Sequence, residues 1–198
     1  MDLVLATHNL HKIREIREML KEIKHLDVLS LSSFPDYKLP EETGETFLEN
    51  ATLKAEHAAQ ALNKWVLADD SGLIVPVLDG QPGVVSKRYA KEDASDADNR
   101  KKLLKEMEGR NDLERSAYFE CCLALASPEG IKKTVSGSVE GTITRHEKGR
   151  NGFGYDSVFR KNDYEKTLAE LDEQTKNRIS HRRKAFDKLL PVLETLKN

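Results

Sequence analysis

The chain has 198 residues, a length typical of one compact domain, and its charges nearly cancel, with 32 Lys and Arg against 34 Asp and Glu. Hydrophobic residues make up 38% of it, which supports a buried core and argues against disorder. No apolar stretch approaches the roughly 20 residues of a membrane span, and the first residues lack the basic flank of a signal peptide. We therefore expect a single domain over residues 1–198, in the cytoplasm and bound to no membrane.

The cysteines agree with a cytoplasmic location. Cys121 and Cys122 are adjacent, and neighbours on a strand point to opposite faces, so a disulfide between them would be strained. The sequence has no Cys-x-x-Cys pair of the kind that binds zinc or performs redox chemistry.

The first half of the chain begins with a strand, a polar turn and a helix. Residues 2–6 predict a short buried strand, and apolar residues spaced by three and four from Ile13 to Ile23 predict an amphipathic helix. Residues 29–39 have the composition of a loop. A second helix begins near Thr46, because Thr46 and Glu49 fit a capping box that satisfies amides at a helix start.

The second half mixes strands and helices. The predicted elements are strands at 65–68, 117–126 and 134–144, an extended segment at 73–78, a helix at 95–107, a glycine-rich loop at 149–155 and a helix at 180–196 that bends near Pro191. Strands that alternate with helices indicate an α/β fold.

Residues 7–12 lie between the first strand and the first helix, where unpaired amides and the helix dipole favour an anion such as phosphate. Thr7 and Asn9 add donors, and Lys12 follows about one turn into the helix. The fingerprints of a P-loop and of a dinucleotide-binding fold are both missing. The alternative is an ordinary capped helix with a solvated lysine.

Acidic residues follow the predicted strand at 65–68. Asp69 and Asp70 diverge in an extended chain, so one carboxylate can face a ligand while the other braces the loop. Such a carboxylate suits Mg²⁺, and either Glu41 or Glu42 could supply a second one. The alternative is an acidic turn before Gly72.

Two further segments could hold a flat ligand. In Gly152–Asp156, glycines let the backbone approach a ring on which Phe153 stacks, and Asp156 could accept a hydrogen bond from a base. His181 and Arg182 project as donors at the start of the last helix. The alternatives are a tight hairpin with core aromatics and a solvated basic turn.

The charge balance and the histidine spacing restrict the ligand. A chain with no net positive charge is a poor partner for nucleic acid, whereas local cations fit one small phosphate-bearing ligand. His8 and His11 lack a third ligand nearby, so we expect no zinc site.

Taken together, six short motifs follow one another in a specific order. They are Thr7-x-Asn9-x-x-Lys12, Glu41-Glu42-Thr43-Gly44 with Glu49-Asn50-Ala51 and Lys54, Ala68-Asp69-Asp70-Ser71-Gly72-Leu73, Pro82-Gly83 with Arg88-Tyr89-Ala90, Phe153-Gly154-Tyr155-Asp156 and Ser180-His181-Arg182. Nearly end to end, the chain resembles the inosine triphosphate pyrophosphatase family, also called XTP/dITP diphosphatases.

The resemblance implies an enzyme that clears deaminated purine nucleotides from the nucleotide pool. Such hydrolases cut ITP, dITP and XTP between the α- and β-phosphates, releasing the monophosphate and pyrophosphate. The resemblance also implies dependence on Mg²⁺, a homodimer, and a two-lobed α/β fold whose elongated mixed sheet is flanked by helices and has a central cleft.

Roles for single residues follow from the same resemblance. The residues implied to grip the phosphates are Thr7, His8, Asn9, Leu10, His11 and Lys12, with help from Lys54 and Ser71. Glu41 and Asp70 are implied to bind Mg²⁺, with Asp70 also the base for the attacking water. The residues implied to hold the nucleotide, mostly its base, are Phe153, Gly154, Tyr155, Asp156, Lys176, His181 and Arg182. The chain departs from the family pattern at His8, where glycine is common, and at Val85 and Lys87.

Three rival functions would also use parts of this sequence pattern. The nearest is a related pyrophosphatase that acts on modified pyrimidine nucleotides. A non-catalytic nucleotide-binding module is the second, and the carboxylates argue against it because an anion binder gains nothing from them without a metal. A nucleic-acid-binding protein is the third, and the charge balance argues against it.

Overall fold

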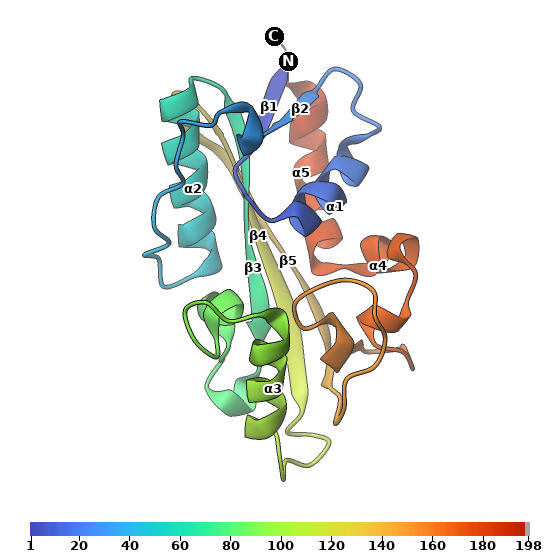
Figure 1. Ribbon diagram of the computed structural model, residues 1–198. Coiled ribbons are helices and arrows are strands. Elements are labelled where there is room, and N and C mark those ends of the chain that lie inside the picture. Colours follow the sequence, from blue (N-terminus) through green and yellow to red (C-terminus); the bar gives the residue numbers. More distant parts are fainter. Residues whose placement is uncertain (197–198) are drawn as a thin grey trace. The chain divides into compact units, whose positions relative to one another are not determined.

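The structure is a computed structural model that describes residues 1–196, and it has a mixed α/β fold (Figure 1). Six strands form one sheet in the order β2-β1-β3-β4-β5-β6. The strands are β1 (Asp2–Leu5), β2 (Asp27–Ser30), β3 (Trp65–Ile74), β4 (Ser116–Ser127), β5 (Gly130–Ile143) and β6 (Phe159–Lys161). The helices are α1 (Leu10–Leu20), α2 (Phe47–Leu62), α3 (Asp96–Glu106), α4 (Glu173–Ile179) and α5 (His181–Thr195).

The chain divides into two compact units, and each is built from separate stretches of sequence. The first unit comprises Met1–Asp70, Cys121–Gly137 and the residues from Arg182 onward. The second unit comprises Ser71–Glu120 and Ser138–His181. Strand β3 therefore changes units between Asp70 and Ser71.

The first unit is organised around parallel strands. β1 pairs in parallel with both β2 and β3, and Leu3, Val4 and Leu5 are fully buried, as expected for the central strand of a parallel sheet. Helices α1 and α5 pack on one face of these strands, and Figure 1 shows α2 on the opposite face. The core beneath α1 and α5 includes Leu3, Leu5, Ile13, Ile16, Leu20, Leu67, Leu123, Phe186 and Leu189.

Helix α2 begins and ends as local chemistry dictates. Thr46 caps it, accepting a hydrogen bond from the Glu49 amide in the predicted capping box, and Asn63 ends it in the left-handed conformation. Its buried face is built from small residues such as Ala51 and Ala55, which allow the helix axis to approach the sheet closely. The predicted start of this helix is confirmed.

The second unit has its own apolar core. That core includes Leu73, Tyr89, Leu103, Met107, Phe119, Ile143, Tyr155, Val158, Phe159 and Leu168. Helix α3 packs Leu103 into it and starts at a second capping box, formed by Ser95 and Asp98. The predicted helix at 95–107 is thus confirmed with ends shifted by one residue.

The structure corrects the sequence-based assignment at several places. Strand β3 continues through Asp69 and Asp70 to Ile74, although the predicted strand ended at residue 68. Pairing of β3 with its neighbours in the sheet outweighs the low strand propensity of these residues. Pro76–Leu78 is a 3₁₀ turn instead of a strand, and α4 precedes the last helix without having been predicted. Across residues 1–196, no helix combines the length and apolar character needed to cross a bilayer.

Candidate functional site

The acidic pair lies in the middle of β3, and its two carboxylates face opposite sides of the sheet. Successive residues of a strand alternate between faces. Asp69 meets side chains from α1 and α5, whereas Asp70 meets Lys54 from α2. Adjacent residues of the same type therefore have different surroundings, as the sequence had suggested in outline.

Asp69 is enclosed by donors on its face of the strand. Its Oδ1 pairs with the Lys12 ammonium, and its Oδ2 accepts hydrogen bonds from Arg182 Nε at 2.7 Å and from the Cys121 thiol at 3.0 Å. Burial alone would raise the pKa of Asp69, but Arg182 and Lys12 outweigh that effect and hold its pKa well below the usual range. Asp69 is therefore a permanent buried anion.

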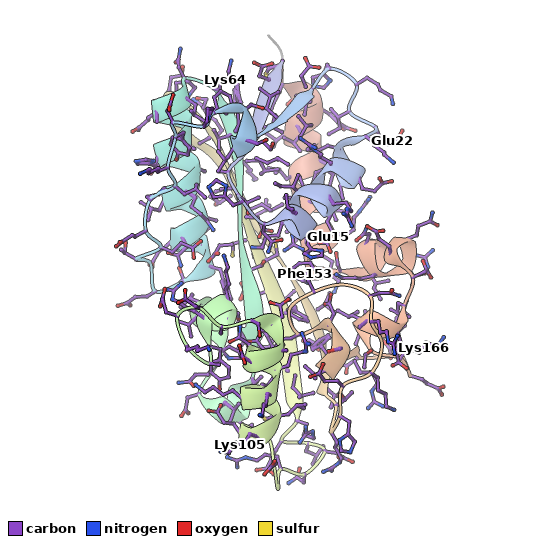
Figure 2. The ribbon with its side chains drawn as sticks, viewed as in Figure 1. Glu15, Glu22, Lys64, Lys105, Phe153 and Lys166 are labelled. Atoms are coloured by element: carbon purple, nitrogen blue, oxygen red, sulfur yellow. The ribbon has the colours of Figure 1, made fainter. Side chains whose placement is uncertain are left out.

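The Arg182 guanidinium, only 1% exposed, joins Asp69 to a second acid. It pairs with Glu15, which extends from α1 three residues after Lys12 (Figure 2). Lys12, Asp69, Arg182 and Glu15 thus form a network of alternating charges, called here the buried quartet. This network fixes the first turns of α1 against β3 and the start of α5.

The start of α1 has the geometry expected of an anion site. Asn9 caps the helix, and its Oδ1 accepts hydrogen bonds from the amides of His11 and Lys12 at 2.9 and 3.2 Å. Thr7 holds Asn9 in turn, through a 3.1 Å bond from the Asn9 amide to its hydroxyl. No acidic residue occupies the first turn of α1. Lys12 has three donors, so it can stay paired with Asp69 and also bind a phosphate.

Three other residues of the 7–12 segment are exposed. They are His8, Leu10 and His11, and Leu10 is 74% exposed. Their predicted role in gripping phosphate rests on the backbone of this turn, since leucine has no side-chain donor. That role stays a prediction.

Asp70 shares one cation with a second acid. Lys54 Nζ donates to Asp70 Oδ1 at 3.0 Å, to Glu42 Oε1 at 2.7 Å and to the carbonyl oxygen of Asp69 at 2.9 Å. Burial raises the pKa of Asp70, and nearby Glu42 adds to the rise, while Lys54 only partly opposes it. Burial would lower the pKa of Lys54, but the two carboxylates raise it instead, so the ammonium stays charged.

The second carboxylate oxygen of Asp70, Oδ2, differs from the other oxygens of the acidic pair in its hydrogen bonding. Asp70 Oδ2 is buried and has no hydrogen-bond partner among the residues that the structure describes. A buried acceptor without a donor is costly unless a cation, a water or a proton meets it. The two acids of β3 are therefore unequal: Asp69 is fully bound, and Asp70 keeps one reactive oxygen.

Asn50, a residue with no predicted functional role, ties the loop that carries Glu42 to α2. The Asn50 side chain accepts a 2.7 Å hydrogen bond from the Gly44 amide and donates to the Gly44 carbonyl at 3.3 Å. These bonds tie the loop before α2 to the helix that provides Lys54. Glu41 is exposed, so the contacts favour Glu42 as the acid beside Asp70.

The donor set of this region fits Mg²⁺. No group of three or more His, Cys, Asp or Glu side chains that could hold a metal occurs within residues 1–196. Mg²⁺, however, keeps several waters and binds through one or two carboxylates together with substrate phosphates. Asp70 with either Glu42 or Glu41 supplies such a pair, and Asp70 Oδ2 is an acceptor in need of a cation.

The loop at Gly152–Asp156, called here the aromatic loop, is held by contacts between residues of the second unit. Asp156 Oδ2 accepts a 2.9 Å hydrogen bond from the Phe153 amide and pairs with Lys176 Nζ at 2.7 Å. The Lys176 ammonium also lies 4.6 Å from the centre of the Phe153 ring. Gly152 has a φ of +77°, and a Cβ there would lie 2.1 Å from Asp156 Oδ2, so only glycine fits. Figure 2 shows Phe153 on this loop.

Tyr155 and His181 are interior residues of the second unit. The Tyr155 hydroxyl donates to the Ser86 carbonyl at 2.8 Å, and burial raises its pKa above the usual range. The His181 ring stacks on Phe119 at 4.9 Å. Ser71 follows Asp70 on β3 and is half-buried. Direct contact of these side chains with a nucleotide stays a prediction, as does the central cleft.

Four residues that shape these clusters were missed or left open from sequence: Glu15, Glu42, Asn50 and Cys121. A signal existed for Glu15, because it lies between Ile13 and Ile16 on the buried side of the helix. Nothing local marked Cys121 as a donor to Asp69, because the two residues are 52 positions apart.

Comparisons with known proteins agree with one another. The model of the Ham1 family matches residues 3–192. A protein named dITP/XTP pyrophosphatase from Protochlamydia amoebophila is 60% identical, with 100% of both chains covered. One of the same name from Chlamydia abortus is 51% identical, with 99% of this chain and 96% of that protein covered. The structure of the Ham1 protein from Staphylococcus aureus has a TM-score of 0.89 at 42% identity and covers 100% of both chains.

Proposed function

The chain belongs to the Ham1 family, and from this premise we propose that it hydrolyses deaminated purine nucleoside triphosphates. ITP, dITP and XTP are the proposed substrates, and a nucleoside monophosphate and pyrophosphate are the products. Two relatives that are 60% and 51% identical are named dITP/XTP pyrophosphatase, which supports this substrate class. The role would be removal of damaged nucleotides from the pool.

The observation on which the chemistry rests is the buried Oδ2 of Asp70, which has no hydrogen-bond partner within residues 1–196. An oxygen in this state can orient a water or accept its proton, and its raised pKa makes it a better base than an ordinary aspartate. Asp69 cannot do the same, because cations and the Cys121 thiol occupy its oxygens. We assign the base role to Asp70 and the bracing role to Asp69.

The start of α1 is the proposed site for the phosphates. The positive end of the α1 dipole, the Thr7–Asn9 turn and Lys12 provide donors and positive charge where the pyrophosphate group would depart. Attack at the α-phosphorus in line with that leaving group requires positioning and charge stabilisation more than covalent help. The buried quartet keeps Lys12 in the orientation this requires.

Mg²⁺ is the proposed cofactor, held by Asp70 together with Glu42 or Glu41. When bound, it would neutralise phosphate charge that otherwise repels the nucleophile. Lys54 would keep the two carboxylates together before the ion arrives, because its ammonium contacts both of them.

Base choice is assigned to the loop at Phe153–Asp156 and to Lys176. Hypoxanthine and xanthine have a 6-oxo acceptor where adenine has a 6-amino donor. Donors from Lys176 or from backbone amides would be left unpaired by adenine, which can reject a ligand by about 10⁴–10⁵-fold. GTP shares the 6-oxo group, so its exclusion must come from the 2-amino group.

A panel of nucleotides tests the proposal. We expect pyrophosphate release in equal amounts with the monophosphate from ITP, dITP and XTP, lost with EDTA and restored by Mg²⁺. Values of kcat/KM should lie far above those for ATP and GTP. Comparable ATP turnover would contradict the base assignment, orthophosphate release would contradict the cleavage position, and preference for a modified pyrimidine would favour the rival pyrophosphatase.

We also propose a cytoplasmic homodimer that binds no nucleic acid. The free cysteines and the balanced charge support a reducing compartment and a small ligand over a polyanion. Light scattering on the purified protein should give twice the chain mass of 22.4 kDa. Salt-sensitive binding to duplex DNA would contradict the prediction about nucleic acid.

A further inference from the structure

One residue of the aromatic loop is held by a helix that no site prediction included. The Gly154 amide donates to Asp96 Oδ2 at 2.6 Å, and the Gly154 carbonyl accepts from Arg100 Nη1 at 2.8 Å. Both polar atoms of this residue are therefore fixed by charged side chains from α3. Bonds in which one partner is charged are stronger than neutral ones.

Helix α3 is built to present these two side chains together. Asp96 and Arg100 are four residues apart, so they lie on one face of the helix. The capping box of Ser95 and Asp98 fixes the first turn, and the positive end of the helix dipole favours an anion at Asp96. The acceptor for the Gly154 amide is thus preorganised.

Arg100 also bonds to Glu147, which lies in the segment before the loop. Its Nε donates to Glu147 Oε2 at 2.8 Å, and the same oxygen accepts a 3.0 Å bond from the Ser157 hydroxyl. Glu147 precedes the loop and Ser157 follows Asp156, so both ends of the loop are tied to α3 through Arg100. The Arg100 side chain is only 18% exposed, which limits competition from water.

Gly154 needs this support because a glycine can adopt many backbone conformations. Its φ is +59°, and among the described residues other than its two chain neighbours no atom lies within 4 Å of where a Cβ would be, so packing does not restrict it. Asp156 bonds to the preceding amide of Phe153 and Lys176 lies over the Phe153 ring, whereas Asp96 and Arg100 bond to the amide and the carbonyl of Gly154 itself. The direction of the Phe153 ring therefore depends on both sets of bonds.

We propose that Asp96 and Arg100 are positioning residues for the nucleotide base: they hold the Phe153–Asp156 loop in its binding conformation before the substrate arrives. This inference rests on the proposed function, in which that loop receives the purine. A loop ordered in advance loses less conformational entropy on binding. Asp96 and Arg100, called here the clamp, should therefore act on the affinity for the base. It should not act on the phosphates or on the chemical step.

The test compares Arg100→Met and Asp96→Ala with two matched controls beside them. Lys101→Met removes an exposed cation next to Arg100, and Asp93→Ala removes an exposed carboxylate three residues before Asp96. We expect KM for ITP to rise about tenfold in each clamp variant, the equivalent of one lost hydrogen bond to a charged group. The kcat and the inhibition constant for pyrophosphate should stay near wild type, and Asp96→Asn, which keeps an acceptor oxygen, should retain most of the affinity.

Amide hydrogen exchange across residues 149–157 provides a readout independent of turnover. Exchange should quicken in the clamp variants and not in the controls. Unchanged KM, unchanged exchange, or an equal loss in the Asp93→Ala control would each overturn the positioning role, as would a fall in kcat with no rise in KM. If the wild type fails to hydrolyse ITP, the proposed function fails, and unchanged loop exchange would then show separately that the clamp does not hold this segment.

Discussion

The two faces of β3 give an aspartate side chain opposite electrostatic surroundings. Asp69 is surrounded by Lys12, Arg182 and Cys121, and its pKa is lowered. Asp70 shares the Lys54 cation with a second carboxylate, Glu42, and its pKa is raised. The difference teaches that the number of cations per carboxylate, more than burial, separates a structural acid from a reactive one.

The comparison also explains why both acids are needed. Two poorly paired carboxylates side by side on one strand would repel each other. The buried quartet neutralises one of them, Asp69, inside the protein. Because Asp69 is balanced there, Lys54 is left to Asp70 and Glu42. The four predictions below test this division.

The largest effect is expected from removing the reactive acid. Asp70→Asn keeps the shape of the side chain but cannot accept a proton, so kcat for ITP should fall about 10²–10⁴-fold. The thermal midpoint should not fall, because no fully paired charge is lost. Asp79→Asn, an exposed substitution on a left-handed residue that asparagine tolerates, is the matched control. Turnover within a fewfold of wild type would assign the base elsewhere.

Removing the structural acid should affect stability first. Asp69→Asn removes the buried anion that Lys12 and Arg182 share, which costs about 3–5 kcal/mol of unfolding free energy. Urea denaturation measures this loss, with Asp27→Asn as the control, since its carboxylate makes only an exposed 3.7 Å contact with the amino terminus. A loss equal to the control would mean that the quartet does not hold α1 in place.

The pH dependence of stability should have opposite signs at the two positions. The raised folded pKa of Asp70 means that its contribution is fully present below the usual value of 3.8 and is lost as pH rises through the folded pKa. Without divalent ions, Asp70→Asn should therefore gain thermal midpoint relative to wild type as the pH rises from about 4 through the folded pKa of Asp70. The lowered pKa of Asp69 predicts the reverse, because its contribution is present above 3.8 and is lost only as pH falls through the folded pKa. Parallel curves for wild type and Asp70→Asn would contradict the raised pKa.

The smallest effect is expected at Cys121. A thiol is a weak donor, so losing its bond to Asp69 in Cys121→Ala should cost about 1–2 kcal/mol, including the small space left behind. Cys121→Ser keeps a donor and should cost less, because a hydroxyl can also bond to Asp69 Oδ2. Chemical denaturation of the two variants decides the order, and a serine variant less stable than the alanine variant would show that the thiol acts by packing alone.

The predictable parts of the fold were those with local signals. The capping box at Thr46 and Glu49 defined the start of α2, and the spacing of Ile13 and Ile16 defined the buried face of α1. The edge strands β2 and β6 have only four and three residues, too few for a period to show. They form because a neighbouring strand offers hydrogen bonds, which no local pattern reports.

The site was predictable as a set of residues but not as a set of contacts. The segment 7–12 and the acidic pair were found because helix starts and carboxylates have known uses. The sequence could not show which of Asp69 and Asp70 is structural and which is reactive. The residue that pairs with Asp69 is Arg182, which lies 113 residues away. Arg182 was expected only as a donor to the nucleotide, and its bonds to Asp69 and Glu15 could not be foreseen.

That distance along the chain has a consequence for synthesis on the ribosome. At about 5–20 residues per second, the guanidinium that neutralises Asp69 is made on the order of ten seconds after Asp69 itself. Until then the emerging polypeptide contains Glu15 and Asp69 without their common counter-charge, while every residue of the second unit has already been polymerised. A nascent chain halted before position 182 would therefore leave the first unit incomplete and vulnerable to proteases, however well the second had folded.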